Sequence, residues 1–266
     1  MIIKSKYNFL IPFKVKKLIR LGRNFDGGYL VCKDALKHCE NLITLGVGDD
    51  ISFENDFRKK TKPKNIYLYD YTVNHILFLR IIIKYFRRLI TFRTKFENFI
   101  HSIKNYINFL FLLSKSNVYL FKLRVVKKIQ KKFDIKFNEI FEKIRSDKNL
   151  LKIDIEGSEY EIIDDIIKLN SKLKVIIIEF HNINKNKNIF IRSVKKLKKN
   201  FDIIHLHANN YLPIKNNYEF FDVIEISFVN KNINMYRKEI RKKFPIKNLD
   251  FECFPDRKKI YFKFEY

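Results

Sequence analysis

The chain has 266 residues, of which 46% are apolar, and it carries a formal net charge of +26 at pH 7. This length and apolar content can bury one substantial core, so we expect residues 1–266 to form a single domain rather than two. The charge favours an anionic partner, but lysine is one of several abundant residues with A/T-rich codons, so the charge alone names no partner.

The cysteines and the N-terminal segment indicate the compartment. Cys32, Cys39 and Cys253 show neither a zinc-binding spacing nor a disulfide framework. Residues 1–13 lack the apolar run and small-residue cleavage site of a secretory signal, and no stretch of about 18 apolar residues is free of charge. We therefore expect a cytoplasmic protein, with peripheral contact to a membrane as an open possibility.

The N-terminal part predicts a short basic helix over residues 15–21 that ends at Gly22. The Asp26-Gly27-Gly28 turn then leads into a strand, which is typical of a hairpin. Arg23 and Asp26 immediately precede the central strand in sequence. They are therefore also candidates for binding an acceptor substrate at the mouth of a site.

The stretch from Leu42 to Asp50 predicts a strand that runs into a Gly-Val-Gly turn, with a helix over residues 52–60 and a second strand over residues 66–70. A strand, a tight turn, a helix and a strand ending on an acid form a nucleoside pocket in α/β proteins. The turn lacks the third glycine of the dinucleotide fingerprint, and Asp49 and Asp50 would repel a pyrophosphate.

These carboxylates suit a cofactor with positive groups. S-adenosylmethionine carries a sulfonium and an ammonium, and Asp70 at the end of the second strand is placed to accept the two ribose hydroxyls. The predicted cofactor-binding residues are Gly46, Val47, Gly48, Asp49, Asp70 and Tyr71.

Residues 73–132 are predicted to form a basic helical insertion. Its cations, among them Arg80, Lys84, Arg87 and Arg88, recur at helical spacing and so share one face. Three interpretations stay open: a solvated face, a basic wall over an anionic acceptor, or an amphipathic helix on an anionic membrane. A strand over residues 118–126 and a helix over residues 138–144 are also expected.

The second diagnostic stretch runs from Leu150 to Ile163. It predicts a buried strand that delivers Asp154 and Glu156 at its carboxyl end, a turn at Gly157, and a helix that begins near Ser158. Two further acids, Glu159 and Glu161, fall in the first turn of that helix. They are expected to be surface residues that favour the helix dipole.

Strands are expected at residues 175–180, 203–206 and 223–229, with a helix at residues 189–200. Strands that alternate with helices predict an α/β fold with a doubly wound, mainly parallel sheet, whose ligands lie at the carboxyl ends of its strands. The polar residues at those ends are the candidates for chemistry. They are His181 as general base, because the unperturbed pKa of histidine is about 6.5, Asp154 as second base or orienting group, and Glu156, His207 and Asn209 as acceptor ligands. A structural histidine bonded to Glu179 or to the backbone stays open as the alternative for His181.

The segment from Leu151 to Glu161 resembles the hallmark of the FkbM-like family of S-adenosylmethionine-dependent methyltransferases. Residues 26–29 and 46–54 are similar to a branch of the same family. The resemblance implies the class I, Rossmann-like methyltransferase fold and mostly O-methylation, often of sugars or natural products. The basic segment is longer than the usual connection in that family, which leaves the acceptor open.

The expected function is therefore O-methylation of a hydroxyl on a sugar or glycoconjugate. A nucleic-acid methyltransferase is the first alternative; the charge favours it, but no Asn/Asp-Pro-Pro-Tyr/Phe motif is present, and we expect no nucleic-acid partner. A non-enzymatic membrane-surface protein is the second. We expect no metal, although Asp154, Glu156 and His181 have suitable ligand types, and the oligomeric state stays open.

Overall fold

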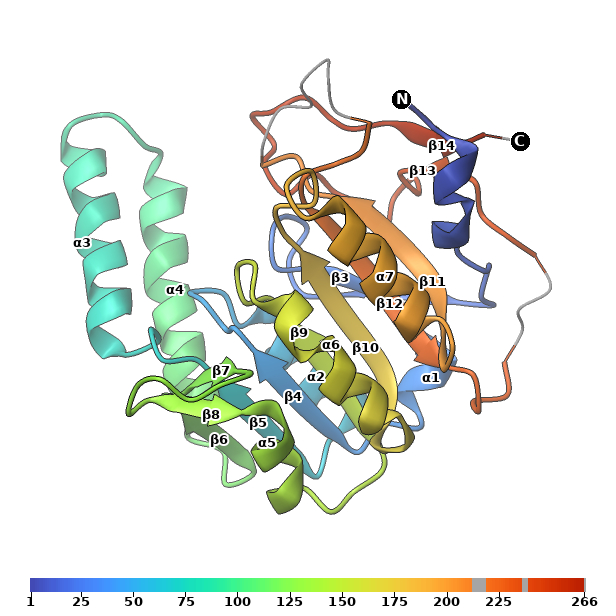
Figure 1. Cartoon of the computed structure of the whole chain (residues 1–266). Coiled ribbons are helices and arrows are strands. Elements are labelled where there is room, and N and C mark those ends of the chain that lie inside the picture. Colours follow the sequence, from blue (N-terminus) through green and yellow to red (C-terminus); the bar gives the residue numbers. More distant parts are fainter. Residues whose placement is uncertain (212–218, 236–238, 266) are drawn as a thin grey trace.

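The computed structural model describes residues 1–211, 219–235 and 239–265. Its centre is a seven-stranded sheet (Figure 1). In sheet order the strands are β11 (Phe201–Ala208), β12 (Ile224–Asn230), β10 (Leu173–Phe180), β9 (Asn149–Ile153), β4 (Asn41–Leu45), β5 (Asn65–Tyr69) and β6 (Val118–Phe121). Six of these strands run in the same direction and β12 runs in the opposite one, so the predicted mainly parallel, doubly wound sheet is confirmed.

Helices cover both faces of this sheet (Figure 1). One face carries α5 (Phe137–Lys143), α6 (Glu159–Lys168) and α7 (Lys187–Leu197), and the other carries α1 (Lys33–Leu36) and α2 (Ser52–Thr61). Alternate residues of β10 serve the two cores, Ile176 and Ile178 on one face and Val175 and Ile177 on the other. Burial on both faces explains why this strand is an almost unbroken apolar run.

The helix predicted over residues 15–21 is wrong. Leu18–Leu21 is a strand, β2, that pairs antiparallel with β3 (Tyr29–Cys32) through the predicted glycine turn. Ile19 lies opposite Val31 in this pair. The basic local pattern suggested a helix, but the hydrogen bonds of the hairpin decide the conformation.

The basic insertion is shorter than predicted. It consists of α3 (His75–Ile90) and α4 (Phe96–Leu113), which project together from the body (Figure 1). The strand expected over residues 118–126 is two strands, because β6 joins the edge of the central sheet while β7 (Arg124–Val126) pairs with β8 (Asp134–Lys136). Across the described ranges, none of the helices has the length and apolarity needed to cross a membrane.

A small sheet that the sequence did not predict joins the two ends of the chain. It contains β1 (Ile2–Ile3), β14 (Phe262–Phe264) and β13 (Lys243–Phe244). Two 3-10 turns, Ser5–Leu10 and Asn170–Lys172, complete the described elements. The C-terminal segment, residues 239–265, packs against the carboxyl end of β11. Phe254 exchanges hydrogen bonds with Asn210, and the thiol of Cys253 lies against His207.

Candidate active site

A row of polar residues crosses the carboxyl ends of the strands. Glu179 on β10 is paired with Glu225 on β12, which is paired in turn with His207 on β11. Asp154 directly follows β9, whose Ile153 is paired with Ile178, so it lies level with Glu179. The topology therefore brings the predicted strand-end residues to one edge of the sheet.

His181 lies among four carboxylates. Its Nδ1 is 2.9 Å from Oε1 of Glu159, and its Nε2 is 3.7 Å from carboxylate oxygens of Asp154, Glu156 and Glu179. The backbone carbonyl of His181 accepts a hydrogen bond from the Tyr160 hydroxyl at 2.7 Å. These contacts fix the position of the ring.

The prediction that Glu159 is a surface residue is wrong. Its side chain is fully buried, and Oε1 accepts hydrogen bonds from the backbone N–H groups of Ile155 and Gly157 as well as from His181. Glu161, in contrast, is exposed as expected. The sequence could not distinguish the buried Glu159 from the exposed Glu161, because the contact with His181 depends on the tertiary structure.

The carboxylates determine the protonation of the imidazole. Burial opposes the charged ring, but the hydrogen bond to Glu159 and the charges of Glu179 and Asp154 outweigh it and raise the pKa of His181 to about 9. Burial also raises the pKa of the Glu179 carboxyl, and the nearby Asp154 adds to that shift. At neutral pH the ring is therefore a cation held by its acidic neighbours.

This arrangement predicts a pH-dependent stability. The folded-state pKa of His181 lies above its ordinary value, so the stability that the charged ring contributes is fully present below about pH 6.5 and is lost as the pH rises through about 9. We expect the difference in unfolding free energy between wild type and His181→Gln to shrink by about 2–3 kcal/mol from about pH 6 to about pH 10. Urea denaturation at both pH values measures it, and an unchanged difference would contradict this environment.

A cleft of about 370 Å³ opens beside His181. The predicted acceptor ligands Asp26, Glu156 and Asn209 line it, together with both predicted catalytic residues. The complete described lining is Asp26, Asp154, Glu156, Glu179, His181, Asn182, Asn209, Tyr211, Asp222, Val223 and Phe254.

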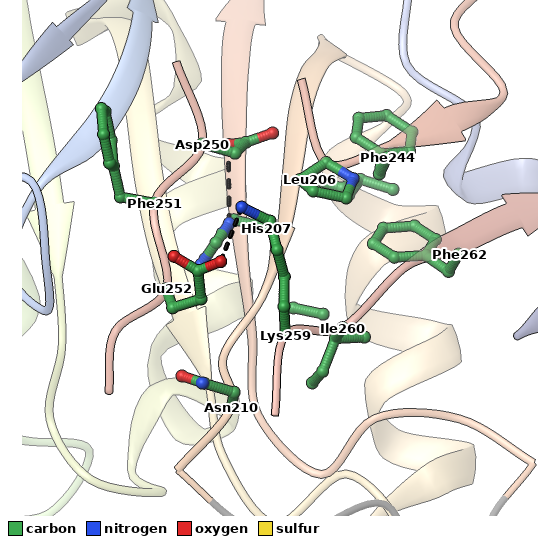
Figure 2. A pocket seen from close by; sticks show the side chains of 12 residues that line it. Leu206, His207, Asn210, Phe244, Asp250, Phe251, Glu252, Lys259, Ile260 and Phe262 are labelled. Atoms are coloured by element: carbon green, nitrogen blue, oxygen red, sulfur yellow. Dashed lines mark ion pairs between the residues drawn. The ribbon is translucent and has the colours of Figure 1, made fainter. Parts of the chain in front are cut away.

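Two predicted acceptor ligands lie outside this lining. The guanidinium of Arg23 is 3.4 Å from Asp50 and donates to the backbone carbonyl of Asp26. Nδ1 of His207 is 3.5 Å from Asp250, and Figure 2 shows its ring turned toward that carboxylate. The cavity drawn there has about 10 Å³, which is too small for an acceptor.

The predicted cofactor residues lie together. Oδ2 of Asp70 accepts hydrogen bonds from the backbone N–H groups of Val47 at 2.9 Å and Gly48 at 3.0 Å. Its Oδ1 accepts from the N–H of Thr72 at 2.7 Å. The acid thus holds the turn in place, a role that the sequence did not reveal. Tyr71 is exposed and stacks on a neighbouring ring, that of Phe133.

Gly46 explains why this turn needs glycine. Its φ is +79°, and a Cβ there would lie 1.7 Å from the backbone carbonyl oxygen of Asp154. The turn therefore passes directly against the end of β9. Asp49, which is exposed, and Asp50, which pairs with Arg23, stand at the turn, and their binding of a positively charged cofactor arm stays a prediction.

The family model described as the Methyltransferase FkbM domain matches residues 33–253. The chain belongs to the FkbM methyltransferase family. It is a methyltransferase with the class I fold, and its cofactor is S-adenosylmethionine. A comparison with curated proteins finds no match.

Solved structures that are similar to this chain include several methyltransferases. A precorrin-6y C5,15-methyltransferase of Geobacter metallireducens GS-15 is 13% identical over 74% of this chain and 86% of its own, with a TM-score of 0.36. A tRNA m1G37 methyltransferase of M. jannaschii is 13% identical over 81% of this chain and 57% of its own, with a TM-score of 0.34. Similarity at this level says nothing about the acceptor of this family member.

The family assignment makes Asp70 the first residue to test for cofactor binding. We expect Asp70→Ala to weaken S-adenosylmethionine binding by about 10–100-fold, because hydrogen bonds to a charged group contribute about 1.5–3 kcal/mol each. Titration calorimetry measures the dissociation constant. Asp34→Ala, on the exposed Asp34–Lys37 pair, serves as the control. Equal affinity in wild type and Asp70→Ala would refute the assigned pocket.

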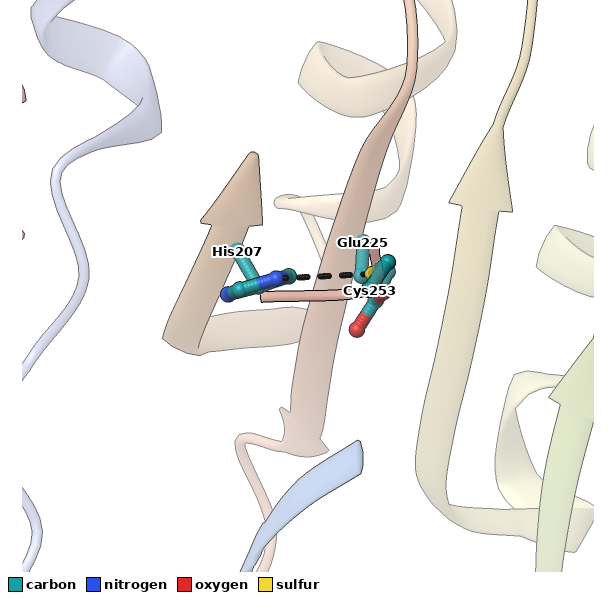
Figure 3. Close-up of side chains that lie close together, drawn as sticks. All are labelled: His207, Glu225 and Cys253. Atoms are coloured by element: carbon teal, nitrogen blue, oxygen red, sulfur yellow. Dashed lines mark hydrogen bonds between the residues drawn. The ribbon is translucent and has the colours of Figure 1, made fainter. Parts of the chain in front are cut away.

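Two groups of side chains in the described chain have the ligand types of a metal site. Asp154, Glu156 and His181 offer oxygen and imidazole ligands in the cleft. The second group is His207, Glu225 and Cys253, whose thiol donates to Glu225 at 3.4 Å and lies 3.6 Å from Nε2 of His207 (Figure 3). In each group the ligand atoms lie within 4.8 Å of one another. The expectation of a metal-free site stays a prediction.

Sequence reasoning missed three contributors to the site. The Tyr29 hydroxyl donates to Glu179 at 3.1 Å and lies 3.5 Å from Asp154, so it tethers the two acids. Its place after the Gly-Gly turn was the available signal. Tyr211 and Phe254 bring aromatic rings to the cleft, with centroids 5.3 Å apart. No motif marks either residue.

Proposed function

We propose that this enzyme transfers the methyl group of S-adenosylmethionine to a hydroxyl of a sugar or glycoconjugate. The observation that carries the proposal is the lining of the cleft. Carboxylates and the amides of Asn182 and Asn209 match the hydrogen-bonding needs of several neighbouring hydroxyls, and Tyr211 and Phe254 offer apolar ring faces. His181 lies in the same cleft.

The charge of the cleft supports a neutral or positively charged acceptor. Its eleven described lining residues include five acidic side chains, one cationic imidazole, that of His181, and no Lys or Arg. A phosphate backbone would be repelled there, although the net charge of the whole chain is +26. This contrast argues against the nucleic-acid alternative.

The methyl transfer needs little more than alignment and removal of one proton. S-adenosylmethionine supplies a sulfonium-bound methyl group. In our proposal, the deprotonated fraction of His181 is the active form: its Nε2 takes the hydroxyl proton as the new O–CH₃ bond forms and the S–CH₃ bond breaks. The Nδ1–H group donates to Glu159, which orients the ring and leaves Nε2 as the free nitrogen of the neutral form. Asp154 and Glu179 then stabilise the imidazolium.

An acceptor screen tests this function. Purified enzyme and S-adenosylmethionine labelled in the methyl group are incubated with neutral sugars, glycosides, polysaccharides, RNA and DNA. We expect label in an acceptor hydroxyl of the carbohydrate set, located by NMR, and a much slower labelling rate with Asp70→Ala at limiting S-adenosylmethionine. Methylated RNA or DNA, with no methylated carbohydrate, would refute the proposal and restore the nucleic-acid alternative.

A further inference from the structure

The helical hairpin of α3 and α4 exposes an unusual apolar surface. On α3, Ile76, Leu79, Ile83, Phe86 and Ile90 recur alternately three and four residues apart and are each 47–60% exposed. This spacing puts all five on one side of the helix. We call them the α3 stripe.

The surface continues around the tip and onto α4. Phe92, in the turn between the helices, is 97% exposed, and Phe96 at the start of α4 is 62% exposed. Ile107 and Phe111 on α4 are exposed as well. Solvent-exposed apolar residues that gather on one element mark a binding surface rather than ordinary surface variation.

The centre of the hairpin is packed by other side chains, with the ring centroid of Phe78 lying 4.4 Å from that of Phe109 and 5.4 Å from that of Tyr106. Within the stripe, Phe86 also contacts Phe99 of α4, at 5.7 Å between ring centroids, and is still 48% exposed. Phe78 and Phe109 are buried. The α3 stripe is therefore available to a partner.

The charge of the hairpin identifies the partner. Residues 75–113 contain seven Lys or Arg residues and one acid, Glu97. The four cations at helical spacing on α3 are all exposed, and none has an ion-pair partner within the described ranges. They are Arg80, Lys84, Arg87 and Arg88. On a helical wheel these cations lie beside the α3 stripe, which is the pattern of a helix that binds in the plane of an anionic membrane.

We propose that the α3–α4 hairpin docks on the surface of an anionic lipid bilayer, with the α3 stripe and the tip against the acyl region and the cations among the headgroups. A second copy of the chain fits less well. Pairing two such hairpins would bring their positive charges together, and like charges destabilise helix contacts.

Docking would tether the turn at residues 46–50 to the membrane-bound hairpin. The side chain of Asn105 on α4 donates a hydrogen bond to the backbone carbonyl of Asp49, in the cofactor turn. His75 and Tyr106 join the two helices at the same end of the hairpin, with Nδ1 3.1 Å from the hydroxyl oxygen. The proposal does not depend on the identity of the acceptor.

Vesicle co-sedimentation tests the docking. The full-length protein is mixed with vesicles of phosphatidylcholine alone or with about three parts in ten of phosphatidylglycerol. We expect binding only to the anionic vesicles, with the bound fraction falling as salt screens the headgroups. Absence of binding to anionic vesicles at low salt would overturn the proposal.

Three variants separate the contributions. The stripe variant, Leu79→Ser with Ile83→Ser and Phe86→Ser, is expected to lose at least about tenfold in vesicle affinity. The charge variant replaces the four α3 cations by Gln and is expected to lose its preference for anionic vesicles. A charge-matched control replaces exposed cations on and beside α7 by Gln: Lys185, Arg192, Lys195 and Lys199.

The control variant should bind vesicles as the wild type does, and a comparable loss there would overturn the proposal by making the binding a general charge effect. Light scattering addresses the competing occupant. A dimer that the stripe variant abolishes, together with vesicle binding that it leaves intact, would assign the stripe to a second copy of the chain. Unchanged S-adenosylmethionine binding in every variant shows that the body stays folded, which separates this result from a failure of the proposed catalytic function.

Discussion

Replacing His181 by Gln is expected to lower kcat for methyl transfer by about 10²–10⁴-fold, the usual contribution of a general base. The reason is its position, with Nε2 in the acceptor cleft and Nδ1 on the buried Glu159. S-adenosylmethionine binding should be retained, because the predicted cofactor residues stand at the turn held by Asp70. Rates are measured on the acceptor that the screen identifies.

The pH profile distinguishes a base from a residue that only supports the structure. For the wild type, kcat/KM should rise with pH, reach half its maximum near the pKa of His181, about 9, and level off above it. Glu159→Gln removes the carboxylate that stabilises the imidazolium, so the midpoint should move to lower pH. Glu161→Gln, on the exposed side of the same helix, should leave the profile unchanged. If the kcat of His181→Gln were within tenfold of the wild-type kcat, His181 would not be the base, and Asp154 would be the next candidate.

Replacing Lys152 by Met is expected to destabilise the fold by about 3–5 kcal/mol, the range measured when one partner of a buried ion pair is removed. Lys152 is 3% exposed, and its Nζ is 3.4 Å from Oε1 of Glu54, which is fully buried. Thr44 also donates to that oxygen, at 3.0 Å. Without the lysine, Glu54 would be an uncompensated charge in the core beneath α2.

Urea denaturation of a double-mutant cycle measures this coupling. Glu54→Gln keeps an acceptor for Thr44 and removes the charge, so Lys152→Met with Glu54→Gln should be more stable than Lys152→Met alone. Lys64→Met is the control, since Lys64 pairs with Glu40 on the surface at 2.8 Å and should cost less than about 1 kcal/mol. If Lys152→Met and Lys64→Met lowered the unfolding free energy by the same amount, the Lys152–Glu54 pair would not stabilise the core as proposed.

The sequence by itself determined the sheet and the two motifs at its edge. The strands β4, β5 and β9 are apolar runs followed directly by Gly46, Asp70 and Asp154, and β10 is followed by His181. Such runs are typical of parallel strands that are buried on both faces. Because parallel strands end at one edge, Asp70, Asp154 and His181 could be placed together without coordinates. The same motifs carried the family resemblance that the FkbM model confirms.

Only the tertiary structure decided features that depend on partners distant in sequence. The β2 strand forms because Tyr29–Cys32 comes back to pair with it, which overrides a helical local pattern. Glu159, at the start of α6, is buried because its carboxylate forms a hydrogen bond with His181, which follows β10. His207 lies outside the cleft because its ring faces Asp250, which the C-terminal segment places beside it. The spacing of the α3 stripe is also that of a helix face packed into a core. Only the tertiary structure shows that these side chains are exposed to solvent. Periodicity defines which residues share a face, but what covers that face is set by contacts that the local sequence does not encode.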